Sequence, residues 1–72
     1  MDIKARIPGK LIAVHVKEAD KVKAGDIVAH LEAMKLENPI VSPIDGTVAP
    51  LTVGTGDIVR IGDVIMSILP EE

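Results

Sequence analysis

The sequence contains no cysteine, phenylalanine, tyrosine or tryptophan among its 72 residues. The missing cysteines exclude a disulfide framework, a cysteine-based zinc site and a thiol nucleophile. Small β proteins stack nucleic-acid bases on aromatic side chains, so the missing aromatics and the net charge of −3 argue against nucleic-acid binding. No apolar run approaches the roughly 18 residues of a membrane span, and the N-terminus shows no secretory signal pattern. We therefore expect a cytoplasmic protein that contacts neither nucleic acid nor membrane.

The residues that are present favour strands. Ile and Val, which suit pleated and half-buried surfaces, make up 19 of the 72 residues. Apolar and polar side chains alternate over residues 10–16, where Ile12, Val14 and Val16 share one face, and again over residues 27–33. Turn signals rich in Gly, Pro and Asp separate these runs, and no segment shows helical periodicity. The pattern predicts an all-β fold, and the length predicts a single domain over residues 1–72.

The chain also contains an internal repeat. Residues 9–31 align with residues 46–68 without a gap, and six of the 23 pairs are identical. The identical pairs are Gly9/Gly46, Val16/Val53, Asp20/Asp57, Val22/Val59, Gly25/Gly62 and Asp26/Asp63. We interpret the halves, about 1–34 and 35–72, as two copies of a four-strand unit related by an approximate two-fold axis. The expected architecture is a flattened barrel or sandwich of two four-stranded antiparallel sheets.

The repeat helps to separate structural residues from functional ones. Asp20 and Asp57 occupy equivalent turns, as do Asp26 and Asp63. Because each feature is present in both copies, we expect these carboxylates to bond to their own backbone rather than to act in catalysis.

The two histidines align with hydroxyl residues of the second copy, His15 with Thr52 and His30 with Ser67. This alignment predicts a polar, outward position for both imidazoles. No further ligands stand at the defined spacing that a metal site needs, so no metal site is expected. The sequence contains no set of nucleophile, acid and base either, and we expect a protein that is not itself an enzyme.

One segment has no counterpart in the repeat. Residues 32–38 read Glu-Ala-Met-Lys-Leu-Glu-Asn and join the two halves. The strands predicted at 27–33 and 36–42 leave only Met34 and Lys35 to connect them. A two-residue hairpin favours Asn-Gly or Asp-Gly because both positions need positive φ, so Met-Lys breaks the local rule. Such a violation indicates a functional site that displays Lys35, whereas the other five lysines are expected to be ordinary surface residues.

The residues around Lys35 resemble a known motif. Ala33-Met34-Lys35-Leu36, preceded by Glu32, resembles the attachment motif of biotin carboxyl carrier domains within the biotinyl/lipoyl attachment family. The segments 7–10 and 42–48 resemble the family's openings of its first and second halves. Leu36 departs from the usual second Met of the motif. The short link between residues 16 and 22 resembles the family members that lack a protruding thumb.

The resemblance implies a function and a set of partners. Lys35 would be joined to biotin by a biotin protein ligase, and Glu32, Ala33, Met34 and Leu36 would flank it for recognition by the ligase and other partners. The arm would carry carboxyl groups between the biotin carboxylase and carboxyltransferase sites of a biotin-dependent carboxylase, transcarboxylase or decarboxylase.

Two alternatives remain open on sequence alone. One is a lipoyl carrier of a 2-oxoacid dehydrogenase-type complex, a group that usually has Asp before the lysine and Ala after it. The other is an unmodified barrel-sandwich module of an adaptor protein.

Overall fold

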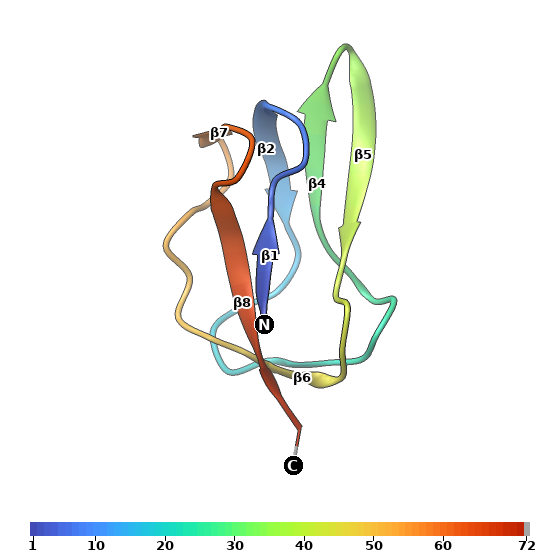
Figure 1. Ribbon diagram of the computed structural model, residues 1–72, viewed down its shortest axis with the longest axis vertical. Coiled ribbons are helices and arrows are strands. Elements are labelled where there is room, and N and C mark those ends of the chain that lie inside the picture. Colours follow the sequence, from blue (N-terminus) through green and yellow to red (C-terminus); the bar gives the residue numbers. More distant parts are fainter. Residues whose placement is uncertain (72) are drawn as a thin grey trace.

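The computed structural model describes residues 1–71, which form two four-stranded antiparallel sheets (Figure 1). The strands are β1 (Asp2–Lys4), β2 (Gly9–Val14), β3 (Lys21–Val22), β4 (Ile27–Ala33), β5 (Leu36–Val41), β6 (Gly46–Val48), β7 (Ile58–Val59) and β8 (Val64–Pro70). Over these residues no helix is formed, and none could therefore cross a membrane. The predicted all-β sandwich is confirmed.

The order of the strands shows the internal symmetry directly. One sheet has the order β1-β8-β6-β3 and the other β5-β4-β2-β7. Exchanging β1 to β4 for β5 to β8 converts one order into the other. Strands β4 and β8 keep the same bounds once 37 residues are added. Because each sheet takes two strands from each half, the halves interlock, and neither half can complete a sheet alone.

The four aspartates of the repeat act as turn formers. Asp20 and Asp26 each accept a hydrogen bond from the backbone N–H three residues earlier, at 2.8 and 2.9 Å. Asp57 and Asp63 accept the equivalent bonds, both at 2.8 Å. These contacts confirm the structural interpretation of the carboxylates and define two turns that recur in each half.

The core lies between the sheets and consists of aliphatic side chains and Met66. Its largest fully buried apolar side chains are Leu11, Val28, Val48, Val59, Ile65 and Ile68. The expected faces of two strands were partly wrong. Bulges lie between Leu11 and Ala13 and between Ile27 and Ala29. They bury Leu11 completely and leave Ile27 on the surface, since one extra residue reverses the faces of those before it.

In each sheet, one glycine allows the two central strands to approach each other closely. A Cβ atom on Gly9 would overlap the carbonyl oxygen of Glu32, and one on Gly46 would overlap that of Leu69. The two pairs are equivalent in the repeat. At Gly9 this close approach holds β2 against the end of β4, at the first residue of the segment that has no repeat counterpart.

Candidate functional site

The segment that joins the halves is a two-residue hairpin at one end of the molecule (Figure 1). Ala33 pairs with Leu36, so only Met34 and Lys35 form the turn, as the sequence predicts. Both have positive φ, 53° and 65°. Positive φ at both central residues is the requirement of a type I′ turn, whose twist matches that of the flanking strands. Each L-residue held in this region costs on the order of 1–2 kcal/mol, so the turn is strained.

A left-handed residue elsewhere in the chain has a different origin from the two in the hairpin. Ala19 is the one other residue besides Met34 and Lys35 in the described range, glycines excepted, with positive φ, at 72°. Its repeat partner is Gly56, which has a φ of 97°. The left-handed position at Ala19 therefore belongs to the repeated turn. The left-handed positions at Met34 and Lys35 belong to the unrepeated hairpin.

The hairpin exposes its tip and anchors its base. Met34 and Leu36 are 89% and 67% exposed, and Lys35 is exposed as well. Ala33 is buried immediately beneath them. Five consecutive register pairs between β4 and β5, from Ala29 with Ile40 to Ala33 with Leu36, support the turn, so the backbone of Lys35 is carried on a regular stretch of ladder above the bulge. The structure thus brings together four of the five predicted site residues at the tip.

Asn38 braces the hairpin from below. Its side-chain Nδ2 donates to the carbonyl oxygens of Leu31 at 3.3 Å and Leu36 at 3.2 Å. The amide therefore links the two strands behind the turn. Sequence reasoning missed this role. Two signals were available, the position of Asn38 at the end of the unrepeated segment and its place after the lysine in the motif that resembles the attachment family.

The fifth predicted residue, Glu32, lies on the outer face of the sheet. It pairs across the ladder with Glu37 on one side and with Lys10 on the other, and all three side chains are exposed. Opposed like charges repel one another, and Lys10 offsets part of this repulsion. The result is an acidic pair in the ladder, one register pair below Ala33 and Leu36.

The two histidines lie on this outer surface too, and they touch. His15 Nε2 and His30 Nδ1 are 2.7 Å apart, and the rings are edge-on at 89° with centroids 4.9 Å apart. Sequence analysis placed both outward but did not predict the contact, because it depends on the bulge in β2. Residues 1–71 contain no cluster of three or more metal-ligating side chains.

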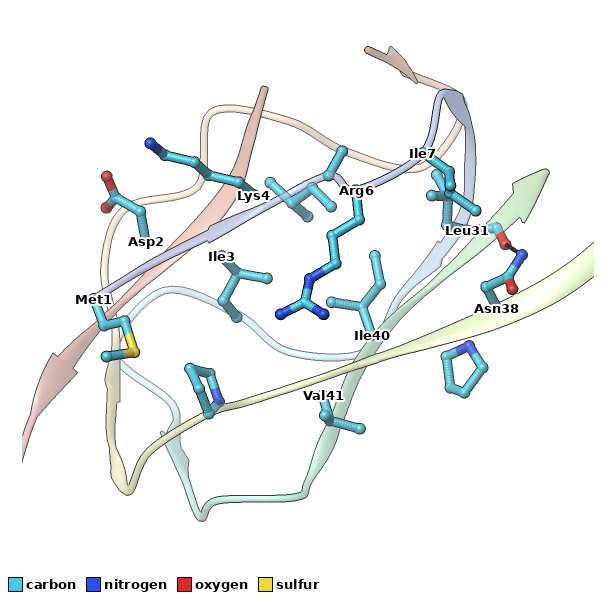
Figure 2. Close-up of a pocket in the computed structure, with 14 residues that line it drawn as sticks. Met1, Asp2, Ile3, Lys4, Arg6, Ile7, Leu31, Asn38, Ile40 and Val41 are labelled. Atoms are coloured by element: carbon cyan, nitrogen blue, oxygen red, sulfur yellow. Dashed lines mark hydrogen bonds between the residues drawn. The ribbon is translucent and has the colours of Figure 1, made fainter. Parts of the chain in front are cut away.

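A groove of about 630 Å³ runs between the edge strands β1 and β5 (Figure 2). Ile3, Arg6, Ile7, Asn38 and Ile40 are among its lining residues, and Figure 2 shows Arg6 directed into it. The lysine at the hairpin tip is not part of its lining.

Comparison with known proteins finds a matching family and similar proteins over most of this chain. A family model described as "Biotin-requiring enzyme" matches residues 1–68. A biotin/lipoyl attachment protein of Bacillus subtilis is 40% identical over 68 residues, covering 94% of this chain and 93% of that protein. A biotinylated protein homologue of Mycobacterium leprae is 36% identical over 64 residues, covering 89% and 90%.

A larger protein contains a similar fold. The crystal structure of the Kluyveromyces lactis urea carboxylase superposes with a TM-score of 0.88 and 29% identity. The match covers 96% of this chain but only 6% of that enzyme. In that enzyme, a unit of this size and fold is one small part of a long polypeptide.

Proposed function

The chain belongs to the biotin/lipoyl attachment family, and from this premise we propose that it carries biotin on Lys35 as a biotin carboxyl carrier. The observation that carries the assignment is the strained two-residue turn that holds Lys35, exposed, at the tip of a rigid hairpin. The carrier is not itself catalytic. It presents the prosthetic group to the active sites of other proteins.

The residues at the tip fit a covalently attached biotin. The primary amine of an exposed lysine can form an amide with biotin's carboxyl group, and the open turn leaves room for an enzyme to approach. In the attachment step the bond between Nζ and the carboxyl carbon forms and the bond from the activated carboxyl to its leaving group breaks. The lysine ammonium loses two protons to base, and Nζ keeps one hydrogen as the amide N–H. When bound, biotin carries a carboxyl group on a ureido nitrogen.

The fold selects one lysine among six by position. Lys35 alone lies in a turn with positive φ at two successive residues. A flexible arm of single bonds of about 1.5 Å each gives a reach on the order of 15 Å from the backbone. Tethering on this arm raises the effective concentration at partner active sites into the millimolar range.

The partners follow from this role. We propose a biotin protein ligase that modifies Lys35, with biotin carboxylase and carboxyltransferase subunits or domains between which the arm moves. Met34 and Leu36 would give these partners apolar contacts on either side of the arm. The flanks also favour biotin over lipoate, whose attachment sites usually have Asp and Ala in these two places.

The test is labelling by a purified biotin ligase from the same host, followed by mass spectrometry of the intact chain and its peptides. We expect one biotinyl adduct per chain, confined to Lys35. Lys35→Arg should take no label, while the matched control Lys10→Arg on a neighbouring strand should be labelled like the wild type. A lipoyl adduct on protein from the native host would support the alternative carrier.

A further inference from the structure

We propose that the biotinyl arm on Lys35 folds back along β5 and that its bicyclic head binds in the groove between β1 and β5. This inference rests on the proposed function and gives the prosthetic group a resting site on the carrier itself. The groove would cover the head between visits to partner active sites, and the head would leave the groove to reach them.

The groove begins within reach of the hairpin lysine. Its lining follows β5 from Asn38 to Val41, so the strand that comes directly after Lys35 forms one of its walls. At about 3.4 Å per residue of an antiparallel strand, Asn38 lies roughly 10 Å from Lys35 and Ile40 roughly 17 Å. An arm with a reach on the order of 15 Å can therefore place its head between Asn38 and Ile40 without any movement of the sheets.

The size and the walls of the groove suit the head of the arm. Its volume of about 630 Å³ falls within the roughly 300–1,000 Å³ of pockets that bind small molecules. Ile3 of β1 and Ile40 of β5 belong to its opposite walls, and both are half-buried. The fused rings of biotin are mostly hydrocarbon with one thioether sulfur. Contact with these isoleucines would remove apolar surface of both partners from water, which favours binding.

Two polar side chains in the groove complement the polar groups of the arm. Figure 2 shows Arg6 directed into the groove, and the side-chain hydrogen bonds formed within residues 1–71 do not involve its guanidinium. Asn38 uses Nδ2 for the carbonyls of Leu31 and Leu36, which leaves Oδ1 as an acceptor. The arm offers the opposite set, a ureido carbonyl and several N–H groups. We expect Arg6 to donate to the ureido carbonyl and Oδ1 of Asn38 to accept from an N–H of the arm.

The two polar groups are not part of the repeated architecture. Because β5 is the repeat counterpart of β1, residues 37 positions apart line the two walls of the groove. Arg6 corresponds to Pro43 and Asn38 to Met1, and both of these apolar counterparts also line the groove. Figure 1 shows β1 running from the N-terminus toward the end that carries the hairpin. The half of the groove nearer to Lys35 therefore holds both polar groups, and the far half has their apolar counterparts.

A weak site is sufficient because the head is tethered. A short flexible arm gives an effective concentration in the millimolar range, so a groove with a millimolar Kd for the free head would be about half occupied. Such a site releases the head readily, as a carrier requires. Removing a hydrogen bond from a charged donor should lower the binding constant about tenfold, which reduces the occupancy from about a half to about a tenth.

The test is NMR spectroscopy of the isotope-labelled chain before and after a biotin ligase modifies Lys35. We expect NOEs between the ring protons of biotin and the methyl groups of Ile3 and Ile40. Backbone amide shifts should also change along the groove, at Arg6 and Ile40, in addition to the changes that the new amide bond causes at the hairpin.

Variants of Arg6 test the polar contact. Arg6→Met keeps an unbranched side chain and removes the donors, so the shift changes along the groove should fall about fivefold. Arg6→Lys keeps the charge and a donor, and it should retain most of the changes. Lys10→Met is the matched control, because it removes a cation from an exposed position that does not line the groove, and its shift changes should equal those of wild type. Arg6 and Lys10 are both exposed, so the melting temperatures should stay close to that of the wild-type chain.

Other results would overturn the proposal. Shift changes confined to residues 33–37 of the biotinylated wild-type chain would show that the head stays out of the groove. NOEs between labelled and unlabelled copies, lost on dilution, would show that the arm enters a second copy instead. Equal shift changes in Arg6→Met and wild type would remove Arg6 from the site. Failure of the wild-type chain to take biotin would overturn the proposed function, and the intact mass shows this before any spectrum is recorded.

Discussion

Replacing Met34-Lys35 by Asn-Gly should make the protein more stable while removing its function. Both residues have positive φ, a conformation that costs an L-residue on the order of 1–2 kcal/mol, less for Asn and nothing for Gly. The side chains lost contribute little packing, since Met34 is 89% exposed and Lys35 is exposed too. Glycine raises the entropy of the unfolded chain, which removes up to about 1 kcal/mol of the gain.

The net expectation is a rise of about 1–2 kcal/mol in the free energy of unfolding. For a domain of this size each kcal/mol shifts the melting temperature by about 4–8 °C. Urea titration at fixed temperature measures the free energy directly, and labelling by the ligase should disappear. The matched control is Lys21→Gly in β3, where φ is not positive and glycine should destabilise by about 0.5–1 kcal/mol. A double variant no more stable than wild type would refute the argument that the turn stores strain.

Four further changes give distinct outcomes. Gly9→Ala should destabilise by about 1–3 kcal/mol in urea, because its Cβ would overlap a backbone carbonyl; Gly54→Ala, with nothing within 4 Å of its Cβ, should change stability by less than about 0.5 kcal/mol. Ala19→Gly should be neutral or stabilise by up to about 1 kcal/mol, since relief of positive φ opposes the entropy of glycine; a clear loss in thermal unfolding would contradict this. Lys35→Arg should abolish labelling and leave the free energy of unfolding within about 0.5 kcal/mol, and a larger loss would mean that the lysine is structural. Leu36→Met should leave biotinylation kinetics nearly unchanged, because the substitution conserves volume at a position that is 67% exposed; a severalfold change in kcat/KM would show that the ligase distinguishes the two side chains.

Much of the fold can be predicted from the sequence because the chain contains the same structural unit twice. The ungapped alignment of Asp20 with Asp57 and of Gly25 with Gly62 predicts recurring turns, and the structure forms them with the same hydrogen bonds. The hairpin at Met34-Lys35 was predicted by counting the residues left between two alternating runs. Both inferences depend on local pattern alone, which is where sequence is most informative.

The features that were not predicted depend on contacts between distant segments. The bulges that bury Leu11 and expose Ile27 each insert one residue into a ladder, and strict alternation cannot show where. The contact between His15 and His30 follows from one of those bulges. The row of paired residues that brings Ile58 level with Lys10 and Glu32 requires the pairing of β7 with β2, which neither segment reveals by itself.

The central claim is that Lys35 is the single site of covalent attachment. The most direct test is peptide mapping by mass spectrometry of the protein purified from its native host. The account predicts one biotinyl group on the tryptic peptide covering residues 24–60, left uncut at Lys35 because trypsin does not cleave after an acylated lysine. Cleavage after an unmodified Lys35 in a host that makes biotin ligase, or biotin found on another lysine, would contradict it.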